Sequence, residues 1–128
     1  MRIHIALLAD TPAYEQIKTQ IKEAVLTGAL AGGAQLPSIR LLAKDLSVGV
    51  ITVKRAYEEL EKENLIVSVQ GKGCFVQHID RATIKKINLK TLQERLAALK
   101  KFADISGISM KDMQEILKKV WGETDDKL

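Results

Sequence analysis

Apolar residues recur every three or four positions through the first half of the chain, and turn-forming residues separate the runs. This spacing predicts one helix that ends before Gly28, a second that starts at Ser38, and a third over about 50–63. Residues 1–9 alternate weakly between apolar and polar and predict a short strand ahead of the first helix. The positions expected to face a shared core are Tyr14, Ile17, Ile21, Ala24, Val25, Ile39, Leu42, Ala43, Leu46, Val53, Ala56, Tyr57 and Leu60.

Two further apolar segments, 65–70 and 74–78, have the length of short strands. The residues between them, Gly71-Lys72-Gly73, predict the tip of a hairpin that carries a basic side chain. A tight turn over 47–49 separates the second and third predicted helices. Two short helices joined by such a turn and followed by a hairpin are typical of a winged helix–turn–helix, which places one helix in the major groove of DNA.

The pattern changes after residue 78 to longer amphipathic stripes, which predict two helices of about 15 and 12 residues. Gly107 interrupts the first stripe, and Ser109 to Asp112 has the sequence of a capping box at the start of the second helix. We therefore expect a mostly α fold with a small β-hairpin (α+β). A winged helix–turn–helix domain over 1–78 would precede a helical dimerisation region over 79–128.

The C-terminal stripes present more apolar surface than two helices can bury against each other. One interpretation is that both helices pack back on the N-terminal domain; the other, which we favour, is a symmetric homodimer. Two-fold symmetry would match a palindromic DNA site with half-sites about one helical turn apart. The side chains expected at the dimer interface are Leu92, Leu96, Leu99, Phe102, Met113, Ile116, Leu117, Val120 and Trp121.

The composition is that of a globular protein, with 46% hydrophobic and 28% charged residues among 128. The net charge of +4 is compatible with a nucleic-acid partner. A single cysteine, Cys74, excludes a disulfide within the chain and fits a reducing cytoplasm. No apolar run approaches the ~18 residues that span a bilayer, so we expect a cytoplasmic protein with no membrane association.

Positive charge is concentrated where the predicted helix–turn–helix would meet DNA. The segment 38–57 contains the basic residues Arg40, Lys44, Lys54 and Arg55 and only one acid. Glutamates follow at the far end of the third predicted helix. The N-terminal half of that helix is therefore positive, and the helix dipole adds to the attraction for phosphate there.

The ordered motifs resemble those of the GntR family of bacterial transcription regulators, and the short C-terminal region resembles its YtrA-type subfamily. The resemblance covers roughly residues 1–78. It implies that Ser38 and Arg40 anchor the second helix at the DNA, that the third helix presents its first turns to the major groove, and that the wing tip reaches the minor groove. The matching motifs are Tyr14-Glu15-Gln16-Ile17, Leu36-Pro37-Ser38 with Arg40, Leu42-Ala43, Thr52-Val53, Arg55-Ala56-Tyr57, Leu60-Glu61, Gly71-Lys72-Gly73 and Phe75-Val76. The DNA-binding residues implied are Ser38, Arg40, Gly49, Val50, Ile51, Thr52, Lys54, Arg55, Gly71 and Lys72.

One departure from the family pattern concerns the start of the third helix, where polar residues, often Asn, are usual. This chain has Gly49, Val50 and Ile51 instead. Val50 continues the inward spacing of Val53 and is expected in the core. Our hypothesis is that Ile51 contacts thymine methyl groups, which would favour A·T pairs at that step. The alternative is an exposed isoleucine without a role.

No constellation for catalysis is present, so we expect no enzymatic activity, no cofactor and no metal site. His4 and His78 lack partners at metal-ligand spacing, and the glycines around Lys72 do not form a phosphate-binding loop. Cys74 is interpreted as a packed small residue, with a redox-active thiol as the alternative. The C-terminal region is too short to enclose a ligand pocket of about 300 Å³. The sequence therefore leaves open whether a small-molecule effector exists; the dimer interface is the place where one could bind.

These observations predict a sequence-specific DNA-binding transcription regulator, a repressor that binds a palindromic operator as a homodimer. Its partners would be double-stranded DNA and a second copy of the chain. The alternative from a different class is a winged-helix module for protein–protein assembly without DNA specificity. The basic start of the third helix and Lys72 at the wing tip argue against that alternative, because both place positive charge where DNA would bind.

Overall fold

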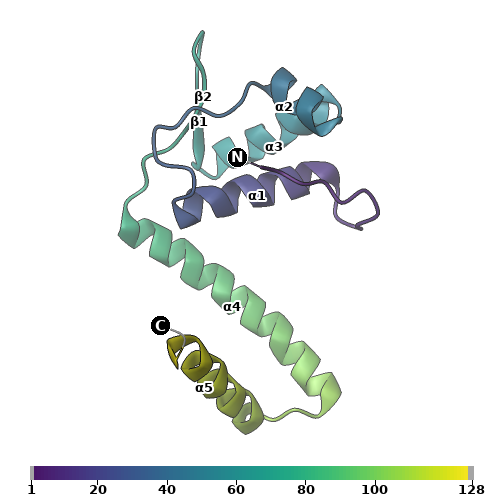
Figure 1. Cartoon of the computed structure of the whole chain (residues 1–128), viewed down its shortest axis with the longest axis vertical. Helices are drawn as coiled ribbons and strands as arrows, with labels where there is room; N and C mark the ends of the chain where they lie inside the picture. The colour runs from purple at the N-terminus through teal and green to yellow at the C-terminus, as the bar shows by residue number, and fades with distance from the viewer. Residues whose placement is uncertain (1, 127–128) are drawn as a thin grey trace. The chain divides into compact units, whose positions relative to one another are not determined.

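The computed structural model describes residues 2–126, which form five helices and one antiparallel hairpin (Figure 1). The predicted mostly α fold with an N-terminal winged helix–turn–helix is confirmed. The chain divides into two compact units, Met1–Ile84 and Lys85–Leu128, and the division falls just inside the fourth helix. The elements are α1 Ala13–Thr27, α2 Ile39–Leu46, α3 Val50–Lys62, β1 Ile66–Val69, β2 Gly73–Val76, α4 Arg81–Ser106 and α5 Met110–Asp126.

The core of the N-terminal unit lies between α1, α2, α3 and the base of the hairpin. The predicted inward faces of the helices are confirmed, with Ile39, Leu46, Tyr14 and Ala24 only partly buried. Val50 was predicted wrongly, because as the first residue of α3 it lies at the open end of the helix and is 47% exposed. The buried residues are Ile3, Ile17, Ile21, Val25, Leu36, Leu42, Ala43, Val53, Ala56, Tyr57, Leu60, Leu65, Ile66 and Val76.

The N-terminal segment is extended but does not form the predicted strand. Side-chain amides from α1 take the place of a partner strand. Gln20 Oε1 accepts from the His4 backbone N–H at 3.0 Å, and its Nε2 donates to the His4 carbonyl at 2.7 Å. Gln16 binds the N–H and carbonyl of Ala6 in the same way, at 2.7 and 3.1 Å. Two glutamines one helical turn apart thus satisfy backbone groups that a sheet would otherwise satisfy.

The hairpin is short and is supported by the loop that precedes α2. β1 and β2 pair in the register Ile66↔Val76 to Val69↔Gly73. The loop adds backbone hydrogen bonds to β2, from Leu36 N–H to the Cys74 carbonyl at 2.8 Å and from Val76 N–H to the Ala34 carbonyl at 2.8 Å. The loop thus forms an isolated β-bridge, Gln35↔Phe75, beside the two-stranded sheet, and this fixes the direction of the wing relative to the loop that leads into α2.

The C-terminal unit begins within α4. Its two helices have 26 and 17 residues, longer than the predicted 15 and 12, because polar residues on either side of the apolar stripes also adopt helical structure. The capping box is confirmed: Asp112 N–H donates to Ser109 Oγ at 3.1 Å, and Ser109 N–H donates to Asp112 Oδ2 at 3.0 Å. Ala103 is the only buried residue among those whose side chains are described in this unit. Between residues 2 and 126, no helix combines the length and hydropathy required to cross a membrane.

Candidate nucleic-acid interface

The turn between α2 and α3 sets the geometry of the candidate interface. Ser38 caps α2, since its Oγ accepts from the Leu41 backbone N–H at 3.1 Å. Ser47 closes α2 in the left-handed conformation with φ 56°, and the chain enters α3 two residues later through Gly49. Gly49 occupies the cap of α3 but provides no side chain to hydrogen-bond the first turn. Thr52 N–H donates to the Gly49 carbonyl at 3.1 Å, but no acceptor among the described residues takes the N–H groups of Val50 and Ile51, which are left to water or to a ligand.

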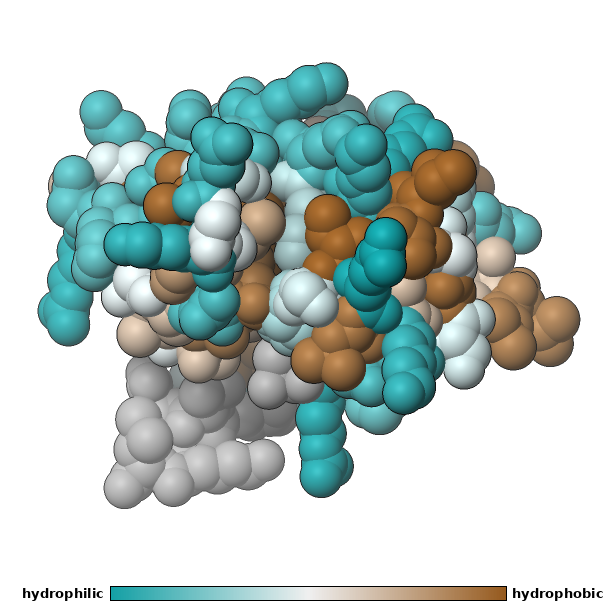
Figure 2. Space-filling model, turned by 90° about the horizontal axis from the view of Figure 1, so that it is seen from above, coloured by the Kyte–Doolittle hydropathy of each residue, from teal (hydrophilic) through white to brown (hydrophobic). Residues whose placement is uncertain are grey.

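An exposed apolar surface lies at the start of α3. Ile51 is 82% exposed, and Val50 and Leu41 are about half exposed. Thr52, the next residue on α3, is half-buried. Figure 2 views the molecule from above, which is the side of Figure 1 where the hairpin tip and α2 lie. This face carries hydrophobic side chains among hydrophilic ones. Exposure of isoleucine to water is unfavourable, so such side chains gain free energy when a partner surface replaces the water.

The wing tip and the start of α2 border one concave surface. Gly71 at the tip has φ 77°, and a Cβ atom there would meet nothing within 4 Å, so the turn conformation alone explains the glycine. Gln35 Nε2 donates to the Lys72 carbonyl at 2.9 Å and holds the tip against the loop. The concavity has a volume of about 510 Å³, and its lining includes Ser38, Arg40 and Lys72. These three residues, which the family motifs imply bind DNA, thus line one surface although Lys72 is distant from the other two in the sequence.

A second concave surface, with a volume of about 740 Å³, is lined by the basic residues of α3. Ile51, Lys54 and Arg55 line it, together with acidic residues from the following turns. Lys54 Nζ lies 3.9 Å from Glu58 Oε1, and both side chains are more than half exposed. Such a pair contributes little to stability in water, so Lys54 is free to exchange Glu58 for phosphate.

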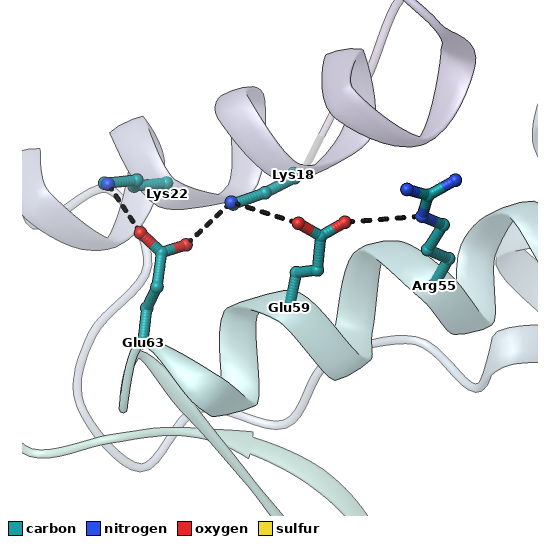
Figure 3. Close-up of polar contacts among 5 residues, drawn as sticks. All are labelled: Lys18, Lys22, Arg55, Glu59 and Glu63. Atoms are coloured by element: carbon teal, nitrogen blue, oxygen red, sulfur yellow. Dashed lines mark hydrogen bonds and ion pairs between the residues drawn. The ribbon is translucent and has the colours of Figure 1, made fainter.

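Arg55 is held more firmly than Lys54, by groups on two helices. Its guanidinium carbon lies 3.8 Å from the centroid of the Tyr14 ring on α1. Its Nε lies 3.6 Å from Oε2 of Glu59, one turn further along α3 (Figure 3). A guanidinium stacked on an aromatic ring and facing a carboxylate has few alternative orientations.

Lysines of α1 continue this ion-pair network along α3. Lys18 Nζ lies 3.5 Å from Glu59 Oε1 and 3.0 Å from Glu63 Oε2, and Lys22 Nζ lies 3.0 Å from Glu63 Oε1. Partial burial opposes ionisation of Glu63, but hydrogen bonds from Lys22 and Lys18 outweigh it and lower the pKa of its carboxyl. The hydrogen bond to Glu63 raises the pKa of Lys18, against the smaller effect of burial. Sequence reasoning missed this network.

The network has a sequence signal that could have revealed it. Tyr14, Lys18 and Lys22 recur every four residues on α1, and Arg55, Glu59 and the C-cap residue Glu63 do so along α3. Residues four apart lie on one face of a helix, so each set forms a row. Only the packing of α1 against α3 shows that the two rows face each other.

Cys74 lies half-buried on β2, with its Sγ 3.3 Å from Ser68 Oγ. Across the described part of the chain, no three His, Cys, Asp or Glu side chains gather closely enough to hold a metal ion. The side chains predicted at a dimer interface are all exposed except Met113, which is half-buried.

The α2–turn–α3 unit followed by a supported wing defines a winged helix–turn–helix protein. Residues 13–76 match the family model described as "Bacterial regulatory proteins, gntR family". The chain belongs to the GntR family. It is 33% identical to the HTH-type transcriptional repressor YtrA of Bacillus subtilis (strain 168) over 118 residues, which cover 92% of this chain and 91% of YtrA. The predicted resemblance to the YtrA-type subfamily is thereby confirmed.

Solved structures agree with this assignment. A transcriptional regulator from Oenococcus oeni is 30% identical, with a TM-score of 0.76 and coverage of 91% of this chain and 97% of that one. The structure "AraR(DBD) in complex with operator ORX1" is 28% identical, with a TM-score of 0.51, over 58% of this chain and 92% of that one. The chain is therefore a transcription regulator and not an enzyme, as the sequence predicts.

Proposed function

We propose that this GntR-family regulator is a cytoplasmic repressor that binds double-stranded operator DNA with sequence specificity. The observation that carries the proposal is the concave surface shared by Ser38, Arg40 and Lys72, where the capped start of α2 faces the wing tip. Hydroxyl and basic groups placed this way suit phosphate oxygens, and they set the position of a duplex against α3. The similarity to the AraR structure that contains an operator supports the DNA partner, and the similarity to the repressor YtrA supports repression.

Base recognition is assigned to the first turns of α3. Ile51 and Val50 would meet thymine methyl groups, and Lys54 and Arg55 would reach phosphates or guanine edges. Thr52 and the uncapped backbone at Gly49 would add hydrogen bonds to phosphate. Gly71 would let the backbone of the wing tip approach the minor groove closely, beside Lys72.

A homodimer is the second part of the proposal. The apolar side chains of α4 and α5 are exposed, although a solvated helix normally keeps one face polar and buries the other. A second copy provides the same apolar face and would cover them, and its two-fold axis would require a palindromic operator. The double variant Leu96→Glu/Leu99→Glu should be monomeric by light scattering and bind DNA more weakly; persistent dimers would contradict this placement.

The decisive experiment for DNA recognition is selection of binding sites from random duplexes at two salt concentrations, followed by sequencing. We expect a palindrome, with an affinity that falls steeply as salt increases. Arg40→Ala and Lys72→Ala should weaken binding to the selected site, whereas Lys119→Ala on α5 is the control for loss of one positive charge. Absence of any DNA binding would favour the alternative, a protein–protein assembly module.

A further inference from the structure

The guanidinium of Arg55 is oriented before any partner binds. Tyr14 covers one face at 3.8 Å from the ring centroid, and Glu59 faces the Nε edge at 3.6 Å. The Arg55 side chain nevertheless remains 61% exposed. It is thus fixed at its base and open at its end. Lys54, by contrast, has one weak ion-pair partner, Glu58, and no aromatic ring stacked on it among the described side chains.

The ion pairs around Arg55 do not cancel its charge. Three cations, Lys18, Lys22 and Arg55, alternate with the two carboxylates of Glu59 and Glu63 (Figure 3). Each lysine lies near Glu63, and Lys18 also lies near Glu59, so the carboxylates are already balanced without Arg55. The excess positive charge of the network is consequently available at its Arg55 end.

Glu59 is itself held in place to face Arg55. Lys18 fixes its Oε1 at 3.5 Å. Its Oε2 is buried and accepts no hydrogen bond from any described residue. A buried carboxylate oxygen in that state is stabilised by a nearby donor, and the Nε–H of Arg55 is the group beside it. The requirement of Glu59 for a donor therefore directs one edge of the guanidinium inward.

The opposite end of the guanidinium is accessible, since the Arg55 side chain is largely exposed. In Figure 3 the contact drawn between Glu59 and Arg55 ends on Nε, and none of the drawn contacts ends on the two Nη atoms. Ile51, one helical turn earlier, lines the same concave surface as Arg55. Two Nη groups in a rigid fork match a pair of acceptors, either N7 and O6 of guanine or two oxygens of a phosphate.

We infer that Tyr14 and Glu59 are positioning residues that fix Arg55 for two-point recognition of an acceptor pair on DNA. The inference rests on the proposed DNA-binding function and assigns part of the recognition to α1, outside the helix–turn–helix. Because the side chain is already fixed, it loses less conformational entropy when DNA binds. Arg55 would therefore contribute to affinity through its orientation as well as its charge.

The test compares operator affinities of full-length variants whose fold is checked by circular dichroism. Glu59→Gln and Tyr14→Leu should each weaken binding by about 3- to 10-fold, whereas Tyr14→Phe, which keeps the ring, should stay within about 2-fold. Glu58→Gln is the matched control, because it removes the same charge one residue away, from a side chain that pairs with Lys54 and not with Arg55. General electrostatics predicts tighter DNA binding for both glutamate variants; the inference predicts weaker binding for Glu59→Gln only.

A double-mutant cycle separates positioning from a merely structural role. In the Arg55→Ala background, Tyr14→Leu and Glu59→Gln should cause no further loss of affinity. Undiminished losses in that background, or tighter binding by Glu59→Gln, would overturn the inference. So would unchanged affinity of Arg55→Ala, even though operator binding by the wild type would still support the proposed function.

The same variants distinguish the two acceptor sources. Loss of preference at one operator position in Arg55→Ala identifies a guanine edge, whereas uniform weakening with a salt dependence reduced by about one charge identifies phosphate. Either result supports the positioning role when the double-mutant cycle shows coupling. Failure of the wild type to bind any duplex would overturn the proposed function and, with it, this inference.

Discussion

Tyr57 on α3 donates a hydrogen bond of 2.8 Å from its hydroxyl to the carbonyl oxygen of Pro37, which immediately precedes the cap of α2. The Tyr57 side chain is buried, and burial raises the pKa of its hydroxyl well above the usual range, so the group remains a donor. This bond connects the middle of α3 to the segment that presents Ser38. The two parts of the proposed interface are thereby held in a fixed relation.

Tyr57→Phe should reduce the free energy of unfolding by about 1 kcal/mol, since it leaves the Pro37 carbonyl without this donor while keeping the ring. Urea denaturation would measure the change. Tyr14→Phe is the control, because no hydrogen bond of the Tyr14 hydroxyl is present in the described structure, and its midpoint should not move. Equal midpoints for Tyr57→Phe and the wild type would show that the Pro37 contact does not contribute to stability.

The Lys18–Glu63–Lys22 ion pairs should make stability depend on pH at both ends of the scale. The lowered pKa of Glu63 stabilises the fold above its ordinary value of 4.5, and this contribution disappears as pH falls through the lowered folded-state pKa. The raised pKa of Lys18 stabilises the fold below its ordinary value of 10.5, and that contribution disappears as pH rises through the folded-state pKa.

Glu63→Gln tests this dependence by removing the carboxylate. Glu63 and its partners Lys18 and Lys22 are partly exposed, so we expect the free energy of unfolding to fall by at most about 1 kcal/mol. The difference from the wild type, measured by denaturant unfolding, should be constant from about pH 6 to 9 and shrink towards pH 3 as the carboxylate protonates. A difference that persists unchanged at pH 3 would mean that Glu63 acts through packing instead.

Gly49→Asn should stabilise the N-terminal unit by a few tenths of a kcal/mol, roughly 0.3, because asparagine is a better cap than glycine. Gly49 has extended backbone angles of φ −69° and ψ 151°, which any residue adopts, and a side chain there would meet only Thr52 Oγ1 at 3.9 Å. The asparagine oxygen can accept from the first turn of α3. Thermal unfolding measures the gain. Gly49→Ala, which lacks the acceptor, should show no gain in stability. A gain equal to that of Gly49→Asn would mean that the stabilisation comes from restricting the unfolded chain.

Ser109→Ala should loosen the start of α5, because Ser109 and Asp112 satisfy each other's backbone N–H groups. We expect a cost of about 1 kcal/mol for the local helix end. Hydrogen exchange of the amides at 111–113 should accelerate accordingly. Ser106→Ala, at the end of α4, serves as the control and should leave these rates within about twofold.

Local patterns predicted most of this fold because its helices are amphipathic and end at residues with clear conformational preferences. Ser38 caps α2 as expected, and Asn64, a residue type that tolerates φ > 0, adopts the left-handed conformation after α3, with φ 61°. Ser109 and Asp112 form the expected reciprocal pair. In each case the signal and its effect lie within four residues of one another, so tertiary structure is not needed to interpret them.

The remaining features depend on contacts between distant segments. The N-terminal segment has strand-like alternation, but Gln16 and Gln20 provide its partners. Val50 has an inward spacing, but its place at the end of α3 exposes it. The contact between Tyr14 and Arg55 joins residues 41 positions apart and could not be inferred from either helix alone.

The exposed apolar side chains at the start of α3 have a thermodynamic consequence for the proposed complex. Transfer of Val50 and Ile51 from water to a thymine-lined groove would give binding a negative heat-capacity change, which charged contacts alone would not produce to the same extent. Binding enthalpy should therefore become more favourable on warming. This part of the affinity also does not involve counterion release, so operator recognition would retain a component that survives concentrated salt.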